Sequence, residues 1–391
     1  MKTIKDFRLS GKKVVIRCDF NVPIEDGKIT DETRIVESLK TIRYAIDHKA
    51  KVILLSHLGR VKEESDLKKN DLKIVSKRLE KLLGCNVTFI NETRGKELED
   101  SINKMNDGDI ILVQNTRYED LDGKKESSND KELGEYWSSL GDIFINDAFG
   151  TCHRAHASNV GIATNIEKKG IGFLIEKELA ALSSLKRVKR PFIIILGGAK
   201  VSDKIGVIKK LVTKADYILI GGGMAFTFLQ SEGFNIGSSL VDKDSIDFCK
   251  SILEDYEGKI ILPVDVMTNT SYADCKNPNT KLICDIEDDE MGLDIGPKTV
   301  ELFKKYLNDA KTVLWNGPLG VCEFEHFKNS TYDILSFLVE NDIKTIVGGG
   351  DTAAVASLSN LKDKLYHVST GGGATLEYLE GKKLPGIESI K

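Results

Sequence analysis

Short runs of β-branched residues alternate along the whole chain with longer stretches in which apolar residues recur every three or four positions. The first pattern is typical of buried strands and the second of amphipathic helices. The alternation predicts an α/β protein built from parallel sheets with crossover helices. The predicted strands are Val14–Arg17, Val52–Ser56, Val87–Ile90, Ile110–Val113, Ile143–Asn146, Phe192–Leu196, Tyr217–Ile220, Ile260–Val264, Thr312–Trp315, Thr345–Val347 and His367–Ser369.

A long uninterrupted helical pattern divides the chain. From Phe173 to Arg190 there is neither Gly nor Pro, leucines recur at helical spacing, and Pro191 then ends the pattern. A helix of that length extends roughly 27 Å. So many strands exceed what one compact doubly wound sheet holds. We therefore expect two Rossmann-like domains, each a parallel sheet flanked by helices, joined by a connecting helix over 172–190.

Composition narrows the class of protein. Apolar residues make up 41% of the 391 residues and charged residues 30%, which is typical of a globular protein. The net charge is only −4 and no block carries one sign, so nucleic acid is not an expected partner. No apolar run is long enough to span a membrane. Seven cysteines without a CxxC pair or zinc-like spacing indicate reduced thiols, and we expect a cytoplasmic protein.

In the first half, cationic side chains follow the predicted strands. Arg17, the pair His57 and Arg60, Arg117 and Arg154 each lie at or just after a strand end. In open α/β sheets, ligands bind at the carboxyl ends of the strands, and guanidinium groups bind phosphate and carboxylate oxygens bidentately. Any one of these residues alone is better explained as a surface charge. Cations at four strand ends together predict an anion site.

In the second half, adjacent glycines appear for the first time. They form Gly197-Gly198, Gly221–Gly223, Gly348–Gly350 and Gly371–Gly373. Gly-rich turns before helices offer free backbone amides, which favour anions. Lys200 and Lys204, four residues apart, are predicted to share one helical face. Asp351, at a predicted helix start, is suited to hold Mg²⁺ on a nucleotide phosphate.

Other classes of site fit less well. The glycines on their own are compatible with tight turns, but three triple-glycine segments favour ligand contact. There is no GxxxxGK[ST] sequence, which excludes a P-loop enzyme, and no GxGxxG follows the first strand, which disfavours a dehydrogenase. His153 and His156 lack a third metal ligand, so we expect them to pack in a loop. A two-lobed protein that closes on an anion remains the alternative, and Lys200, Lys204 and Asp351 favour a nucleotide site over it.

Eight segments in order resemble the motifs of the phosphoglycerate kinase family. The resemblance runs from about residue 14 to Gly386 and implies a monomer. It implies a phosphoglycerate-binding domain over 1–171, onto which the tail 381–391 packs, and a nucleotide-binding domain over 191–380. The segments are Arg17–Pro23, His57–Arg60, Asp147–Ser158, Gly197–Ile205, Gly221–Phe228, Trp315–Glu323, Gly348–Thr352 and Ser369–Gly373.

The resemblance also implies the reaction and the residues that perform it. The reaction is reversible phosphoryl transfer from 1,3-bisphosphoglycerate to ADP, giving 3-phosphoglycerate and ATP, after hinge closure of the two domains. The implied phosphoglycerate ligands are Asp19, Asn21, Arg34, His57, Arg60, Arg117 and Arg154. The implied Mg-nucleotide ligands are Gly198, Lys200, Lys204, Gly221, Gly222, Asn316, Glu323, Gly350, Asp351 and Thr352. The implied contacts to the transferring phosphoryl group are Arg34, Lys200, Gly371, Gly372 and Gly373.

The implied reaction needs no general base. In the direction that consumes ATP, the acceptor is a carboxylate, which is already an anion at neutral pH. Catalysis then consists of alignment and charge neutralisation. The chain departs from the family pattern beside Arg117, where Gln114 and Thr116 replace the more usual Glu and Leu. This departure removes no implied ligand, but it leaves the local loop conformation open.

Overall fold

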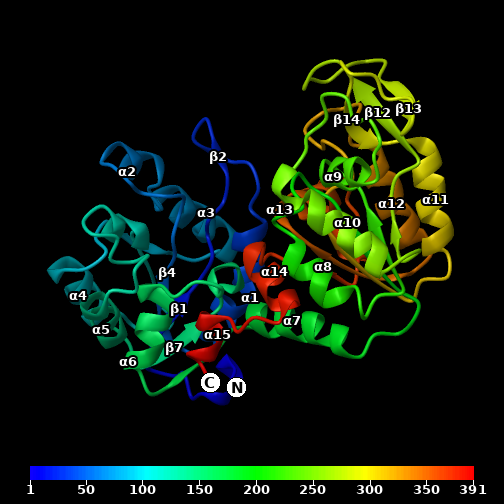
Figure 1. Ribbon diagram of the computed structural model, residues 1–391. Helices are drawn as coiled ribbons and strands as arrows, with labels where there is room; N and C mark the ends of the chain where they lie inside the picture. The colour runs from blue at the N-terminus through cyan, green and yellow to red at the C-terminus, as the bar shows by residue number, and fades with distance from the viewer. The chain divides into compact units, whose positions relative to one another are not determined.

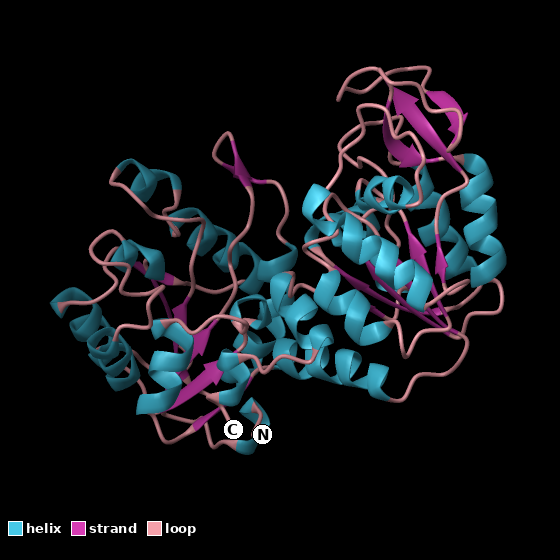
Figure 2. Cartoon of the chain, in the orientation of Figure 1, coloured by secondary structure: helices cyan, strands magenta, loops and turns pink.

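The computed structural model describes residues 1–391. The chain forms two compact units. Unit 1 consists of Met1–Ala180 together with Lys383–Lys391, and unit 2 consists of Ala181–Lys382. Each unit has its own parallel six-stranded sheet with helices around it (Figures 1 and 2). The predicted α/β fold class, with two parallel sheets flanked by helices, is confirmed. None of the helices is both long and apolar enough to cross a membrane.

The sheet of unit 1 has the strand order β5-β6-β4-β1-β7-β8, with every neighbouring pair parallel. Its central strands are almost wholly buried, as expected for a parallel sheet covered on both faces. The strands are β1 (Lys13–Arg17), β4 (Lys51–Leu55), β5 (Thr88–Ile90), β6 (Ile110–Val113), β7 (Ile143–Asn146) and β8 (Lys169–Ile171). The helices are α1 (Thr33–Asp47), α2 (Ser65–Lys69), α3 (Lys73–Leu83), α4 (Lys96–Asn103), α5 (Lys131–Ser139), α6 (Ile162–Asn165) and α15 (Pro385–Glu388).

The sheet of unit 2 has the order β11-β10-β9-β15-β16-β17 and is also parallel throughout. Every residue of its central strand β9 is buried, which follows from the continuous apolar run FIIIL. The strands are β9 (Phe192–Leu196), β10 (Tyr217–Ile220), β11 (Ile260–Ile261), β15 (Thr312–Asn316), β16 (Lys344–Gly348) and β17 (His367–Val368). The helices are α8 (Ile205–Leu211), α9 (Met224–Ser231), α10 (Ile246–Asp255), α11 (Pro297–Leu307), α12 (Asn329–Glu340), α13 (Gly350–Leu358) and α14 (Gly373–Glu380).

Two antiparallel elements were not predicted from the pattern. In unit 1, β2 (Ile24–Glu25) and β3 (Lys28–Ile29) form a hairpin across Asp26-Gly27, and both turn residues have positive φ. The Asp-Gly pair is a known hairpin signal. In unit 2, β12 (Asp265–Asn269) pairs with β13 (Asn279–Leu282) and β14 (Met291–Ile295) in a small separate sheet. Its strands lack the apolar runs that marked the large sheets.

Two predicted boundaries are wrong. The connecting helix predicted over 172–190 ends early: α7 covers Phe173–Ser183 and a 3₁₀ turn follows over Ser184–Lys186. The Ser184 hydroxyl donates to the carbonyl of Ala181 at 2.7 Å, and such a local bond competes with helix propagation. The strand predicted over Ile260–Val264 stops at Ile261, because Pro263 cannot donate to the ladder.

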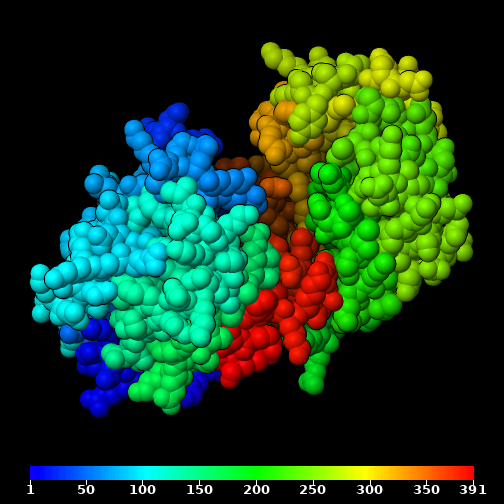
Figure 3. Space-filling view, turned by 60° about the vertical axis from the view of Figure 1, so that its left-hand side comes forward, coloured from blue at the N-terminus to red at the C-terminus, as the bar shows by residue number.

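The end of the chain belongs to unit 1. The side chain of Asn146, at the end of β7, donates to the Gly386 carbonyl at 3.0 Å, and the Gly386 amide donates to the Cys152 carbonyl at 2.9 Å. A Cβ on Gly386 would lie only 2.9 Å from the Cys152 Cα, so the approach is close enough to require glycine. Figure 3 shows this last segment, in red, against the blue-green surface of unit 1.

Candidate active site

The strands that carry the predicted anion site of unit 1 are neighbours in its sheet. The strands β6, β4, β1 and β7 lie side by side and run in the same direction. Their carboxyl ends therefore meet at one edge, where open α/β sheets bind ligands. The loops that follow these strands carry Asp19, Asn21, His57, Arg117 and Arg154.

One of the cations expected on this edge is not on the surface. Arg17, the last residue of β1, is completely buried. Its guanidinium group donates to the Ser158 hydroxyl at 2.8 Å and to the Cys18 carbonyl, and it lies 4.0 Å from the buried carboxylate of Glu126. Arg17 therefore belongs to the core beneath the strand ends. The sequence could not show this, because Glu126 and Ser158 are far from Arg17 in the chain.

Asp19 and Arg34 are brought together. An Nη1 atom of Arg34, in the first turn of α1, lies 3.1 Å from Asp19 Oδ2 and 3.2 Å from the Asn21 carbonyl. Asp19 is buried, whereas about a third of the Arg34 side chain is exposed. The side-chain oxygen of Asn21 accepts the Gly59 amide at 2.8 Å, which ties the first strand-end loop to the second. Arg34 is thus partly exposed to solvent, while its guanidinium group is paired with the buried carboxylate of Asp19.

His57 is an uncharged member of this cluster. Burial, followed by the charges of Arg17 and Arg117, holds the pKa of His57 well below its usual range. The imidazole is therefore neutral at physiological pH and offers one N–H donor and one acceptor. His156 is likewise buried, and burial lowers its pKa to about 3. Its ring packs at the start of a short π-helix over Ala157–Gly161, in agreement with the loop-packing role expected for it.

The other three arginines predicted to bind phosphoglycerate differ in their exposure to solvent. Arg117 is largely buried and donates to Asp120 Oδ2 at 3.1 Å and to the Ser127 hydroxyl at 2.8 Å. Its Nε atom is buried without a hydrogen-bond partner, which leaves a donor for an anion. Arg60 and Arg154 are exposed. The strand-end loops thus carry two exposed guanidinium groups and one partly satisfied group.

Residues that the sequence analysis did not single out hold the loops in place. Asn115 accepts the amides of Leu58 and Arg117 and donates to the carbonyls of Leu58 and Asn70, at 2.7 to 3.1 Å. It therefore links the loop after β6 to the end of β4, through two hydrogen bonds to Leu58, and to the end of α2, through the Asn70 carbonyl. Gln114, one of the departures from the family pattern, donates to Asp71 and Asn91 at 3.0 and 2.9 Å. Polar side chains directly after a buried strand were the only signal in the sequence.

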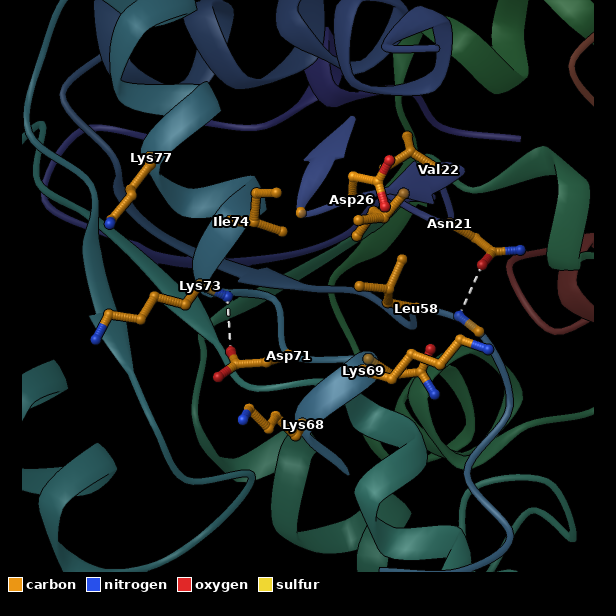
Figure 4. A pocket seen from close by; sticks show the side chains of 14 residues that line it. Asn21, Val22, Asp26, Leu58, Lys68, Lys69, Asp71, Lys73, Ile74 and Lys77 are labelled. Carbon is orange, nitrogen blue, oxygen red and sulfur yellow. Dashed lines mark hydrogen bonds between the residues drawn. The ribbon is translucent and has the colours of Figure 1, made fainter. Parts of the chain in front are cut away.

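A cavity of about 740 Å³ adjoins this edge of unit 1. Asn21 and Gly59 border it on the side of the predicted site, and Val22, Leu58 and Ile74 contribute apolar surface. In Figure 4 the lysines around it spread along the rim, and their ammonium groups do not converge. The rim lysines are Lys68, Lys69, Lys73 and Lys77. The cavity therefore shows no cluster of cations suited to hold a single anion.

In unit 2, glycines allow the backbones of neighbouring strand ends to touch. A Cβ on Gly197 would lie 2.0 Å from the Pro318 carbonyl oxygen, and a Cβ on Gly222 would lie 2.6 Å from the Gly198 nitrogen. Gly198 and Gly222 also have positive φ angles, of +93° and +64°. Real Cβ atoms do not tolerate such distances, so these glycines are required by packing. A Cβ on Gly350 would have nothing within 4 Å, so packing does not explain that glycine.

Lys204, directly before α8, contacts Asn316, the last residue of β15. The Lys204 ammonium donates to Asn316 Oδ1 at 2.5 Å, and both residues are buried. Burial lowers the pKa of Lys204, while the negative charges of Asp203 and Asp351 act to raise it. The Nδ2 atom of Asn316 is buried without a partner. A buried cation with two nearby carboxylates and a free amide donor is suited to hold a phosphate chain with its metal ion.

The predicted shared helical face of Lys200 and Lys204 is wrong. Helix α8 begins only at Ile205, so both lysines precede it. The Ser202 amide donates to Asp242 Oδ2 at 2.9 Å, and the Lys204 amide turns back to the Val201 carbonyl at 2.8 Å. These contacts hold the segment in a turn that leaves Lys200 exposed and Lys204 buried. The two ammonium groups therefore have different environments.

The other predicted residues of unit 2 lie at helix starts and loops. Asp351 is exposed in the first turn of α13, and the hydroxyl of buried Thr352 accepts the Gly317 amide at 3.0 Å. Glu323 is exposed in the loop after β15. The Gly371 amide already donates to the Ser369 hydroxyl at 3.1 Å, whereas a Cβ on Gly372 would meet no atom within 4 Å. Of the last triple glycine, Gly371 is buried, Gly372 is half-buried and Gly373 is exposed.

Comparison with known proteins gives the family. The family model described as phosphoglycerate kinase matches residues 4–382. The chain belongs to the phosphoglycerate kinase family. The protein named phosphoglycerate kinase from Fusobacterium nucleatum is 56% identical over 393 residues, covering 100% of this chain and 99% of that protein. The one from Lacticaseibacillus casei is 57% identical over 389 residues, covering 99% and 98%.

Solved structures of phosphoglycerate kinases agree with the fold. The enzyme from Coxiella burnetii superposes with a TM-score of 0.85 at 38% identity, and the enzyme from Pyrococcus horikoshii with a TM-score of 0.87 at 29% identity. Each match covers 100% of this chain and 98% of the other. The predicted family and the predicted enzyme class, a phosphotransferase with a carboxyl group as acceptor, are confirmed. The roles of individual residues remain predictions.

Proposed function

We propose that unit 1 binds 3-phosphoglycerate or 1,3-bisphosphoglycerate at its strand ends, that unit 2 binds ATP or ADP with Mg²⁺, and that hinge closure aligns the two ligands for in-line transfer. The observation that carries the proposal is the chemistry of the strand-end cluster of unit 1. It is rich in guanidinium groups, the lowered pKa of His57 makes its imidazole a weak base, and Asp19 is engaged by Arg34. A site without a free general base suits an acceptor that is already a carboxylate.

Different residues of unit 1 bind different groups of the substrate. Arg60, Arg117 and Arg154 bind the phosphate of phosphoglycerate, since guanidinium groups match its oxygens. Asp19 and Asn21 hydrogen-bond the hydroxyl and carboxylate end, with His57 beside them. Arg34 has an exposed face next to Asp19 and contacts the transferring phosphoryl group. Its positive charge would neutralise charge that develops on that group.

The residues of unit 2 hold the nucleotide. Lys204 and Asn316 bind its phosphates, Lys200 contacts the transferring group, and Glu323 binds the ribose. No group of three or more His, Cys, Asp or Glu side chains in the chain could hold a metal ion. Mg²⁺ commonly binds through one or two carboxylates and substrate phosphates, and exposed Asp351 provides such a carboxylate. Magnesium would supply charge neutralisation between the phosphates.

Transfer requires the donor and acceptor atoms to approach to about 3–3.5 Å. Because the two ligands are assigned to different units, hinge closure is part of the proposed cycle. We also propose that the chain works as a monomer in the cytoplasm, as its family resemblance implies. Sedimentation of the purified protein at several concentrations tests the oligomeric state.

The decisive experiment is a coupled assay of ATP-dependent phosphorylation of 3-phosphoglycerate, with Mg²⁺ omitted in one control and 3-phosphoglycerate in another. We expect turnover in both directions, and none in either control. A folded sample that shows no turnover in either direction would contradict the proposal. Binding of 3-phosphoglycerate without turnover would instead support the anion-binding alternative.

A further inference from the structure

A chain of buried polar groups runs beneath the strand ends of unit 1. Arg17, Glu126 and Ser158 are all completely buried. The Ser158 hydroxyl accepts from Arg17 Nε at 2.8 Å and donates to Glu126 Oε1 at 2.5 Å, and the Ser158 amide donates to Glu126 Oε2 at 2.9 Å. This arrangement holds the guanidinium group of Arg17 in one orientation. Its remaining nitrogen, Nη2, lies 3.2 Å from Nδ1 of His57.

The chemistry of the guanidinium group decides where the proton of His57 lies. Arginine has five N–H donors and no acceptor, so Nδ1 must accept in this contact. A neutral imidazole then carries its proton on Nε2. Asp19 Oδ1, a possible acceptor for an N–H at Nδ1, lies 3.9 Å away, which is beyond hydrogen-bond distance.

The charges around the ring favour the same neutral form. Arg17, Arg117, Arg34 and His156 all act to lower the pKa of His57, together with burial, which is the largest cause. The two carboxylates nearby are engaged elsewhere. Asp19 pairs with Arg34 at 3.1 Å, and Glu126 accepts two hydrogen bonds from Ser158. No unpaired anion is left to stabilise an imidazolium.

We propose that Arg17 is a positioning residue for His57: by donating to Nδ1, it fixes the neutral imidazole with its proton on Nε2, so that this N–H is available to the anion bound at the strand ends. The inference rests on the proposed assignment of that site to phosphoglycerate. Arg17 itself, being fully buried, does not touch the ligand.

Nitrogen-15 NMR of the histidine rings in the full-length protein without ligand tests the tautomer. The chain has six histidines, and comparison with His57→Gln assigns the signal of His57. We expect the Nε2–H tautomer, with no titration near pH 6.5, where a free histidine titrates. An Nδ1–H tautomer, or an ordinary titration of His57, would overturn the proposal whether or not the substrate assignment holds.

A matched pair of variants tests the positioning role. Removing Arg17 alone would leave Glu126 buried without a counter-charge, so Arg17→Met is combined with Glu126→Gln. Glu126→Gln alone is the control, because Arg17 then still has the negative charge of Asp19 nearby. We expect the control to keep the wild-type tautomer. In the double variant we expect His57 to titrate and KM for 3-phosphoglycerate to rise about tenfold with a smaller change in kcat, as for the loss of one hydrogen bond to a charged ligand. The increase should be smaller at pH 5.5, where the imidazole is protonated.

Binding of Mg-ATP, which is assigned to unit 2, shows that each variant is folded. Equal losses in the control and the double variant, with the tautomer unchanged, would mean that Arg17 is only structural and would overturn the proposal. If His57→Gln binds 3-phosphoglycerate as tightly as the wild type, His57 is not a ligand. That result would remove the functional half of the proposal, while the family activity would still be measurable in the coupled assay.

Discussion

Units 1 and 2 have six-stranded parallel sheets of similar construction, but they shape their strand ends by different means. In unit 1, side chains join the loops: Asn115, after β6, makes two hydrogen bonds to Leu58, after β4, and the Asn21 side chain accepts the Gly59 amide. In unit 2, backbones touch directly, through glycines such as Gly197 and Gly222. Side-chain networks of this kind hold individual charged groups in fixed positions. Close backbone packing leaves an open surface with amides, which suits a phosphate chain.

The largest expected effect concerns the side-chain site of unit 1. Arg34→Ala should reduce kcat by about 10³–10⁵-fold, by analogy with arginine fingers, because its contact is made mainly in the transition state. Steady-state kinetics together with direct binding of 3-phosphoglycerate measure the two effects separately. Arg43→Ala, on an exposed position of the same helix, is the control and should leave turnover close to wild type. A large loss of affinity with kcat nearly unchanged would make Arg34 an ordinary substrate ligand.

The second prediction tests whether the units bind separate ligands. Lys204→Ala should weaken Mg-ATP binding about 10- to 100-fold, as for the loss of a hydrogen bond to a charged group, and leave 3-phosphoglycerate binding nearly intact. Arg60→Ala should do the reverse. Isothermal titration of each variant with each ligand measures both affinities, and for each variant the ligand expected to bind normally is the control. If both variants lost both affinities equally, the assignment of one ligand to each unit would be wrong.

The third prediction tests the backbone packing of unit 2. Gly197→Ala should destabilise the protein by about 1–3 kcal/mol, because the new Cβ would lie 2.0 Å from the Pro318 carbonyl oxygen. Gly350→Ala is the matched variant, since its Cβ would meet nothing within 4 Å, and it should unfold at nearly the wild-type denaturant concentration. Chemical denaturation measures both. If Gly350→Ala still weakens Mg-ATP binding, ligand approach rather than packing explains that glycine.

The smallest expected effect is a pH dependence that both units share. Burial raises the pKa of Asp147 in unit 1 and of Asp294 in unit 2 to about 7. A carboxyl group with a raised folded-state pKa stabilises the fold below its unfolded pKa, and this contribution is lost as pH rises through about 7. Asp147→Asn and Asp294→Asn should therefore gain stability relative to wild type between pH 5 and pH 6, by about 1 kcal/mol.

Denaturation at each pH measures this difference. Asp122→Asn is the control, because that side chain is 95% exposed. A difference that is flat with pH in either buried variant would show that the carboxyl group titrates in its ordinary range. A response in one unit only would show that the two buried carboxyl groups differ.

Patterns local in the chain predicted much of this protein. Continuous apolar runs such as Phe192–Leu196 and Ile110–Val113 predicted strands of both large sheets, because such runs are stable only when buried on both faces. Motifs in order along the chain indicated the family and the candidate ligands. Predictions were weaker where local signals compete. The helical pattern of the sequence continues past Ser184, but the helix itself ends at Ser183, where the Ser184 hydroxyl donates to the Ala181 carbonyl.

The amino-acid sequence by itself determined the α/β class, the alternation that produces two sheets, and the residue types at the strand ends. Only the tertiary structure decided which of these residues are exposed and which are buried. In the sequence, Arg17 resembles the other strand-end arginines. In the structure it is buried, next to Glu126 and Ser158, which are more than a hundred residues away in the chain. Lys200 and Lys204 read as a pair, yet one is exposed and the other is bound to Asn316. Burial and hydrogen-bond partners depend on distant segments, so no local pattern encodes them.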